Sequence, residues 1–119
     1  MRALIVADIK QALLPSWVKR KKRPVVYFQA GIHAGEIDGK DAGFWLLRQI
    51  LEKEANPKLI EALKNVTLVF VPVFNVDGHE RFGKNNRPNQ VGPEEMGWRT
   101  TSQNYNLNRD YVKADSPEM

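Results

Sequence analysis

An apolar strand that leads directly into an amphipathic helix is the feature that most restricts how this chain can fold. Residues Val25 to Gln29 (VVYFQ) are rich in β-branched and aromatic side chains and are bounded by Pro24 and Gly31. This composition is typical of a mostly buried strand. From Glu36 to about Glu54, apolar residues recur mostly every three or four positions, which predicts a helix with one buried face.

Further strands and helices alternate along the chain. Ala3 to Ala7 (ALIVA) predicts a strand interior to a sheet, and Val66 to Phe74 (VTLVFVPVF) predicts another strand that is apolar on both faces. Asn56 and Pro57 predict the start of a short second helix, Pro57 to Lys64. The alternation predicts the α/β class, with a mixed, largely parallel sheet covered by helices, in a single domain over residues 1–119.

The segment from Asn75 to Gly97 has a different character, because it is full of Asn, Gly, Pro and charged residues. It predicts a loop of about twenty residues, and loops of this length in a compact domain are usually functional or disordered. It leaves the carboxyl end of a predicted strand, where open α/β sheets bind their ligands. We therefore expect a functional loop.

His33 and Glu36 lie at the predicted junction between strand and helix. A separation of three residues is nearly one helical turn, so the imidazole and the carboxylate can converge on one point. A neutral imidazole nitrogen and a carboxylate oxygen are ligands that zinc takes at catalytic sites. The other interpretation is an ordinary hydrogen-bonded surface pair, and the spacing alone leaves both open.

Charge and cysteine content limit the partners. The chain has no cysteine, so a metal would be held by nitrogen and oxygen. The net charge of +4 comes largely from Lys19 to Arg23 (KRKKR), which we interpret as a solvated connection between two strands. A phosphate-binding or membrane-surface patch is the alternative, but no interleaved aromatic residues or basic amphipathic helix accompany the run. We expect no nucleic-acid and no membrane partner.

The sequence indicates neither a targeting signal nor a membrane span. The sequence has no run of about eighteen apolar residues, and Met1 to Ala12 lacks the layout of a signal peptide. The compartment and the oligomeric state stay undetermined.

Four motifs occur in one order. They are GIHAGE (Gly31 to Glu36), FNVDGHERF (Phe74 to Phe82), the pair Trp98 and Arg99, and NYNLNRDY (Asn104 to Tyr111). This order resembles the zinc carboxypeptidases of the M14 family. The resemblance implies a zinc-carboxypeptidase-like fold and a Zn²⁺ cofactor.

The resemblance also implies roles for individual residues. His33 and Glu36 match the metal ligands, and Arg99 matches the arginine that polarises the scissile carbonyl. Asn108 and Arg109 match the pair that binds the terminal carboxylate of the substrate. Residues 75, 77 and 78 match the turn of the family, with Val76 where proline is usual. A planar guanidinium suits the roles of Arg99 and Arg109, because it can stabilise an oxyanion and can form a pair of parallel hydrogen bonds with a carboxylate.

Two positions depart from the family pattern. Gly35 stands where many members have an arginine directly before the glutamate ligand, so we expect one contact to the substrate to be missing. Asn106 stands where the family often has an aspartate that orients the first histidine. An asparagine oxygen can still accept from the ring, but it raises the basicity of the ligand less.

The resemblance further implies a third ligand, a histidine on a later strand, and a glutamate base later still. The chain ends at Met119 without either, so we expect an incomplete, truncated domain that is inactive alone. His79 is the other histidine of the chain, and we interpret it as a loop residue. The spacing of Glu80, Glu94 and Glu95 favours none of them as the base.

The function implied is a zinc metallocarboxypeptidase that releases carboxy-terminal residues from a peptide or small carboxylate substrate. A related zinc amidohydrolase that deacylates N-acyl amino acids is the first alternative. A non-catalytic remnant that binds carboxylates is the second.

Overall fold

The computed structural model describes residues 1–7 and 24–119. Its main sheet has three strands in the order β1 (Leu4–Val6), β3 (Thr67–Val71) and β2 (Val25–Gln29). β2 runs parallel to β3 and β1 runs antiparallel to it. The described sheet is therefore mixed, as expected. The basic run from Lys19 to Arg23 lies outside the described residues.

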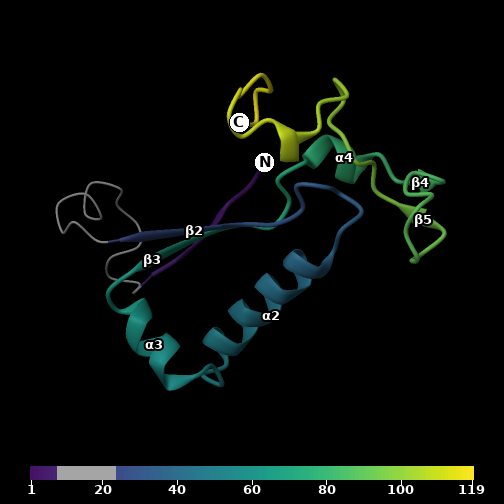
Figure 1. Cartoon of the computed structure of the whole chain (residues 1–119). Helices are drawn as coiled ribbons and strands as arrows, with labels where there is room; N and C mark the ends of the chain where they lie inside the picture. The colour runs from purple at the N-terminus through teal and green to yellow at the C-terminus, as the bar shows by residue number, and fades with distance from the viewer. Residues whose placement is uncertain (8–23) are drawn as a thin grey trace.

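Two helices connect β2 to β3 and lie on one side of the sheet (Figure 1). α2 spans Asp38–Leu51 and α3 spans Pro57–Leu63. The side chain of Asn56 caps α3 by accepting the backbone N–H of Lys58 at 2.9 Å, which is the start signal expected from the sequence. None of the helices in residues 1–7 and 24–119 has the length and apolarity needed to cross a bilayer.

Phe70 of β3 joins the sheet to its helical layer. Its ring stacks on Phe28 of β2, with ring centroids 4.9 Å apart, and meets the edge of Phe44 of α2 at 5.7 Å. Gly43 of α2 lies directly against the same ring. The absence of a side chain at this position lets the helix approach the sheet closely.

The burial expected for the first two strands is wrong. Val25, Val26 and Tyr27 are 52%, 48% and 53% exposed, and Ile5 of β1 is 58% exposed. Within the described residues β1 and β2 are the two border strands, each pairing with β3 alone. Apolar composition predicted the strands correctly, but it carries no information on how many neighbours a strand receives.

The segment from Asn75 to Gly97 is more regular than expected. It contains the helix α4 (Val76–Glu80) and a small hairpin of β4 (Gly83–Lys84) and β5 (Glu95–Met96). The prediction of a loop is wrong for these three elements. Elements this short leave no periodic pattern of apolar residues in the sequence.

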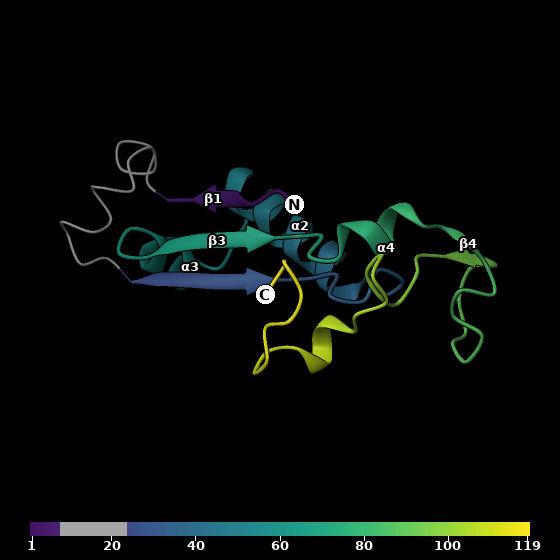
Figure 2. The same cartoon turned by 90° about the horizontal axis from the view of Figure 1, so that it is seen from above.

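The site is built where β2 and β3 end. Both strands point toward α4, while β1 points the other way (Figure 2). The 3-10 helix η1 (Leu107–Arg109) returns to the same end. Leu107 is fully buried against Val71 and Phe74, with Ile32 and Met119 packed around them. This cluster holds segments distant in the sequence beside one another.

Candidate metal and substrate site

The turn after β2 brings His33 and Glu36 to the same side. Gly31 has a φ of +64°, which glycine adopts without strain. The backbone N–H of Glu36 donates to the carbonyl of His33 at 3.0 Å. The buried Lys40 of α2 donates to the carbonyl of Ala34 at 3.1 Å, and burial lowers the pKa of this lysine. The turn is thus fixed to both the sheet and the helix.

His33 is 3% exposed and uses both ring nitrogens. Its Nδ1 lies 3.1 Å from Oε1 of Glu36, and its Nε2 lies 3.0 Å from Oδ1 of Asn106. That same Oδ1 accepts the backbone N–H of Asn108 at 3.1 Å, so the oxygen is identified as an acceptor. It follows that Nε2 carries the proton and that the lone pair of Nδ1 faces Glu36 in the neutral ring.

This arrangement fits a metal ion. A nitrogen lone pair and a carboxylate oxygen 3.1 Å apart repel unless a proton or a cation lies between them. Two ligand atoms of a tetrahedral zinc ion, each about 2.0–2.1 Å from the metal, are roughly 3.3 Å apart. In the described part of the chain no group of three or more His, Cys, Asp or Glu side chains is arranged around one point. Among the described residues, the candidate ligands brought together at this point are therefore His33 and Glu36 alone.

Arg87 is part of the site, and the sequence analysis missed it. Its Nη2 donates to Oε1 of Glu36 at 2.7 Å, and its side chain is 4% exposed. A Cβ atom on Gly35 would lie 3.0 Å from Cγ of Arg87. Gly35, which stands where many members of the family have an arginine, thus leaves room for an arginine from another segment. The only sequence signal is a single cation within the polar run NNRPNQ.

The pKa of Glu36 reflects these neighbours. Partial burial raises this pKa, but the hydrogen bond from Arg87 and the proximity of His33 lower it, and the net shift is downward. The carboxylate is consequently ionised at neutral pH. An ionised carboxylate is the form that binds a divalent cation.

The turn of residues 75–78 positions Arg99. Oδ1 of Asn75 accepts the backbone N–H of Gly78 at 2.9 Å, and its Nδ2 donates to the carbonyl of Arg99 at 3.2 Å. Nη1 of Arg99 lies 3.9 Å from Oε1 of Glu36. The structure thus brings His33, Glu36 and Arg99 together, although they come from two segments.

Asn108 and Arg109 lie in η1, immediately after Asn106. Both are exposed, and Nη1 of Arg109 donates to the carbonyl of Asn108 at 2.8 Å. The buried Leu107 anchors the turn that carries them. Their role in binding a terminal carboxylate stays a prediction.

The remaining candidate residues face other partners. Nδ1 of His79 lies 3.3 Å from Glu80, and its ring meets the ring of Phe82 with centroids 6.1 Å apart. Glu94 forms an ion pair with Lys84 at 2.8 Å. His79 therefore lies in the last turn of α4 and not in a loop as the sequence predicted, and its Nδ1 faces Glu80 instead of the candidate metal site.

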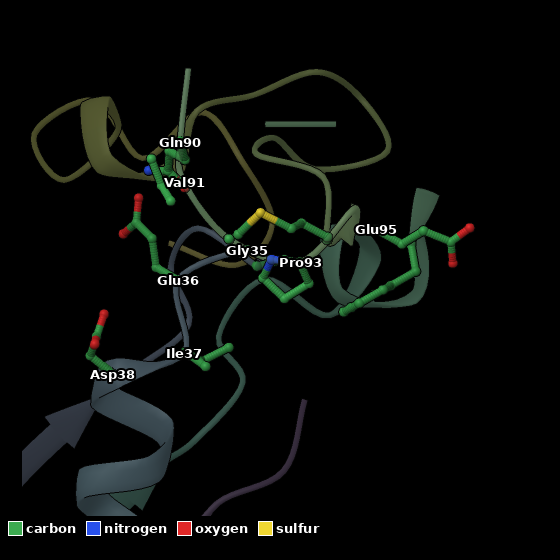
Figure 3. A pocket seen from close by; sticks show the side chains of 13 residues that line it. Gly35, Glu36, Ile37, Asp38, Gln90, Val91, Pro93 and Glu95 are labelled. Atoms are coloured by element: carbon green, nitrogen blue, oxygen red, sulfur yellow. The ribbon is translucent and has the colours of Figure 1, made fainter. Parts of the chain in front are cut away.

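A cavity of ≈ 540 Å³ lies beside Glu36. It is formed by the turn of residues 34–38, by Phe82 and by the hairpin segment of residues 90–97, and Figure 3 shows side chains of both segments around it. Its walls are mostly apolar, and its carboxylates are those of Glu36, Asp38 and Glu95. A second cavity of ≈ 340 Å³ is lined by residues 86–90 and Arg99.

Two comparisons with known proteins find similar sequences. A family model described as "Zinc carboxypeptidase" matches residues 1–117. Carboxypeptidase A4 of Mus musculus is 35% identical over 68 residues, which make up 56% of this chain and 16% of that protein. The match thus covers a small part of the length of this relative.

Proposed function

This chain belongs to the zinc carboxypeptidase family, and from that membership we propose that it supplies part of the active site of a peptidase that releases carboxy-terminal residues. The observation that carries the proposal is the position of His33. Its Nδ1 faces the Glu36 carboxylate while its Nε2 is held by Asn106. A ring oriented in this way is prepared for a metal, because the outer hydrogen bond fixes the tautomer.

His33 and Glu36 would hold the zinc ion. When bound, zinc acts as a Lewis acid toward a carbonyl oxygen and increases the acidity of water. Asn106 keeps the lone pair of His33 directed at the site, and Arg87 keeps the Glu36 carboxylate in place by a hydrogen bond of 2.7 Å. These two contacts restrict both ligands before any substrate arrives.

The arginines provide the contacts to the substrate. Arg99, 3.9 Å from Glu36, would stabilise the oxyanion that develops on the scissile carbonyl. Asn108 and Arg109 would bind the terminal carboxylate through the guanidinium fork and the carboxamide. A peptide held at its end in this way would have its last amide bond placed beside His33, Glu36 and Arg99.

The metal site is tested by zinc titration of this chain and its variants. With two protein ligands we expect weak binding, which His33→Ala abolishes and His79→Ala leaves unchanged. We also expect no peptide hydrolysis by these 119 residues alone. Tight stoichiometric binding that is lost in both variants would contradict the proposed ligand set.

The reaction is tested on the natural gene product, at the length at which it is made, loaded with zinc. Substrates are peptides of two and of ten residues, each with a free or an amidated carboxyl terminus, and release of the last amino acid is measured. We expect release from both lengths when the terminus is free. Rejection of the long peptide would favour a deacylase, and binding without release would indicate a non-catalytic protein.

A further inference from the structure

A buried arginine beside the proposed metal site has an amino group without a partner among residues 1–7 and 24–119. Nη2 of Arg87 donates to Glu36, whereas Nη1 is buried and has no hydrogen-bond acceptor in the described part of the chain. Native proteins rarely leave a buried charged donor unsatisfied. A ligand atom that accepts from Nη1 would restore the missing hydrogen bond.

The cavity next to Arg87 is suited to such an acceptor. Its volume is ≈ 340 Å³, and it is lined by Asn86, Arg87, Pro88, Asn89, Gln90 and Arg99. Its two guanidinium groups and the carboxamides of Asn89 and Gln90 can donate hydrogen bonds. The carboxamide of Asn86 already donates to the carbonyls of Arg81 and Met96, each at 2.8 Å. None of these six lining residues is acidic, so the lining selects for an anion.

The charges near this cavity leave a positive excess. One carboxylate, that of Glu36, lies 2.7 Å from Arg87 and 3.9 Å from Arg99. Two guanidinium groups against one carboxylate leave one positive charge before any metal is counted. The neighbouring ≈ 540 Å³ cavity has the opposite character, because three carboxylates and no Lys or Arg belong to its lining. An acidic group of a substrate would therefore enter the cavity of Arg87.

We propose that the cavity lined by residues 86–90 and Arg99 is a subsite for a second carboxylate of the substrate, an acidic side chain on a residue next to the scissile bond. Because Nη1 is sealed from solvent in this structure, the guanidinium of Arg87 turns toward the cavity to bind this carboxylate through Nη1, while Nη2 continues to hold Glu36. The inference rests on the proposed function, since it assumes that a peptide lies across Glu36 and Arg99. It deepens that function by naming the class of substrate, an acidic peptide.

The test uses probes that differ in a single carboxylate. The affinities of acetyl-Glu-Phe and acetyl-Gln-Phe, and of acetyl-Phe-Glu and acetyl-Phe-Gln, are measured calorimetrically on the whole chain. We expect the glutamate probe to bind at least fivefold more tightly in one of the two pairs. Arg87→Met should remove this preference, so that the ratio of the two affinities within that pair falls to about one. Arg48→Met, at an exposed arginine of α2, should retain the preference.

Arg87→Lys is a second variant for the case in which Arg87→Met fails to fold. It keeps the positive charge but loses the two-pronged guanidinium group. We expect it to reduce the preference at least threefold with thermal unfolding close to that of the parent chain. Equal affinities within both pairs, or a preference that survives either substitution at Arg87, would overturn the subsite. Equal affinities within both pairs are also the result expected if water alone, and no substrate carboxylate, accepts from Nη1.

A failure of the proposed function would give a different result from a failure of the subsite. Arg109→Met should weaken the glutamate and glutamine probes alike, because it removes the contact to the terminal carboxylate. If Arg109→Met changes neither affinity, the carboxypeptidase assignment of that contact is wrong. The ratio within each pair still reports on Arg87 separately.

Discussion

Nε2 of His33 lies 3.0 Å from Oδ1 of Asn106, a residue 73 positions further along the chain. The contact joins the turn after β2 to the start of η1, and it leaves Nδ1 of the ring free toward Glu36. A single carboxamide thereby fixes the direction in which the candidate metal ligand presents its lone pair.

Replacing Asn106 should change zinc affinity without removing a ligand. Asn106→Leu leaves Nε2 without an acceptor, and we expect zinc to bind about 10-fold more weakly. Asn106→Asp should bind zinc more tightly than the parent chain, because a carboxylate raises the basicity of the ring. Competition with a chromophoric chelator measures both. Asn65→Ala, between α3 and β3, is the matched control, and equal affinities in all four proteins would contradict the orienting role.

Asn75 should affect both stability and the position of Arg99. It is 1% exposed, caps α4 through Oδ1 and donates to the carbonyl of Arg99 through Nδ2. Asn75→Ala removes both contacts, and we expect a loss of about 1–2 kcal/mol in the free energy of unfolding. Asn75→Ser retains a capping oxygen but not the donor to Arg99, so it should recover part of the stability. Chemical denaturation measures the two variants, and a Ser variant as unstable as the Ala variant would show that the cap matters little.

Gly43→Ala should destabilise the layer between α2 and the sheet. The added methyl group would meet the ring of Phe70, which is held between Phe28 and Phe44. Overpacking of this kind costs about 1–3 kcal/mol, whereas alanine gains about 1 kcal/mol in helix propensity. Because the ring is held on both sides, we expect a net loss.

The matched control for this substitution is Gly83→Ala, since a Cβ there has its nearest neighbour at 3.6 Å. Urea denaturation of both variants gives the comparison. A Gly43→Ala variant as stable as the control would mean that α2 can move away from Phe70 at little cost.

Asp110 should make the segment that follows η1 sensitive to acid. Its carboxylate accepts the backbone N–H groups of Asp115 at 2.9 Å and Ser116 at 2.8 Å, and these hydrogen bonds lower its pKa from the ordinary value of 3.8. A lowered pKa in the folded state stabilises the fold above pH 3.8, and this contribution is lost as the pH falls through the lowered value.

We therefore expect Asp110→Asn to melt at a lower temperature than the parent chain at pH 7, and the difference to shrink as the pH falls below 3.8. Thermal unfolding followed by circular dichroism gives the two curves. Asp115→Asn, at an exposed position, should follow the parent chain throughout. A difference between Asp110→Asn and the parent that is constant with pH would rule out titration of Asp110 as its cause.

Local patterns in the sequence predicted much of the architecture. The β-branched run of Val25 to Gln29 forms a strand, the spacing of apolar residues forms α2, and the pair Asn56 and Pro57 starts α3. The four ordered motifs indicated the family, which the match over residues 1–117 confirms. These features depend on residues close to one another in the chain, so the order of residue types is enough to specify them.

The tertiary structure alone decided which residues surround Glu36 and which strands lie at the border of the sheet. Arg87 reaches Glu36 across 51 positions, and the exposure of Tyr27 depends on the single neighbour that β2 has among the described residues. Such relationships arise from packing and strand pairing between distant segments, and no periodicity or spacing in the sequence records them.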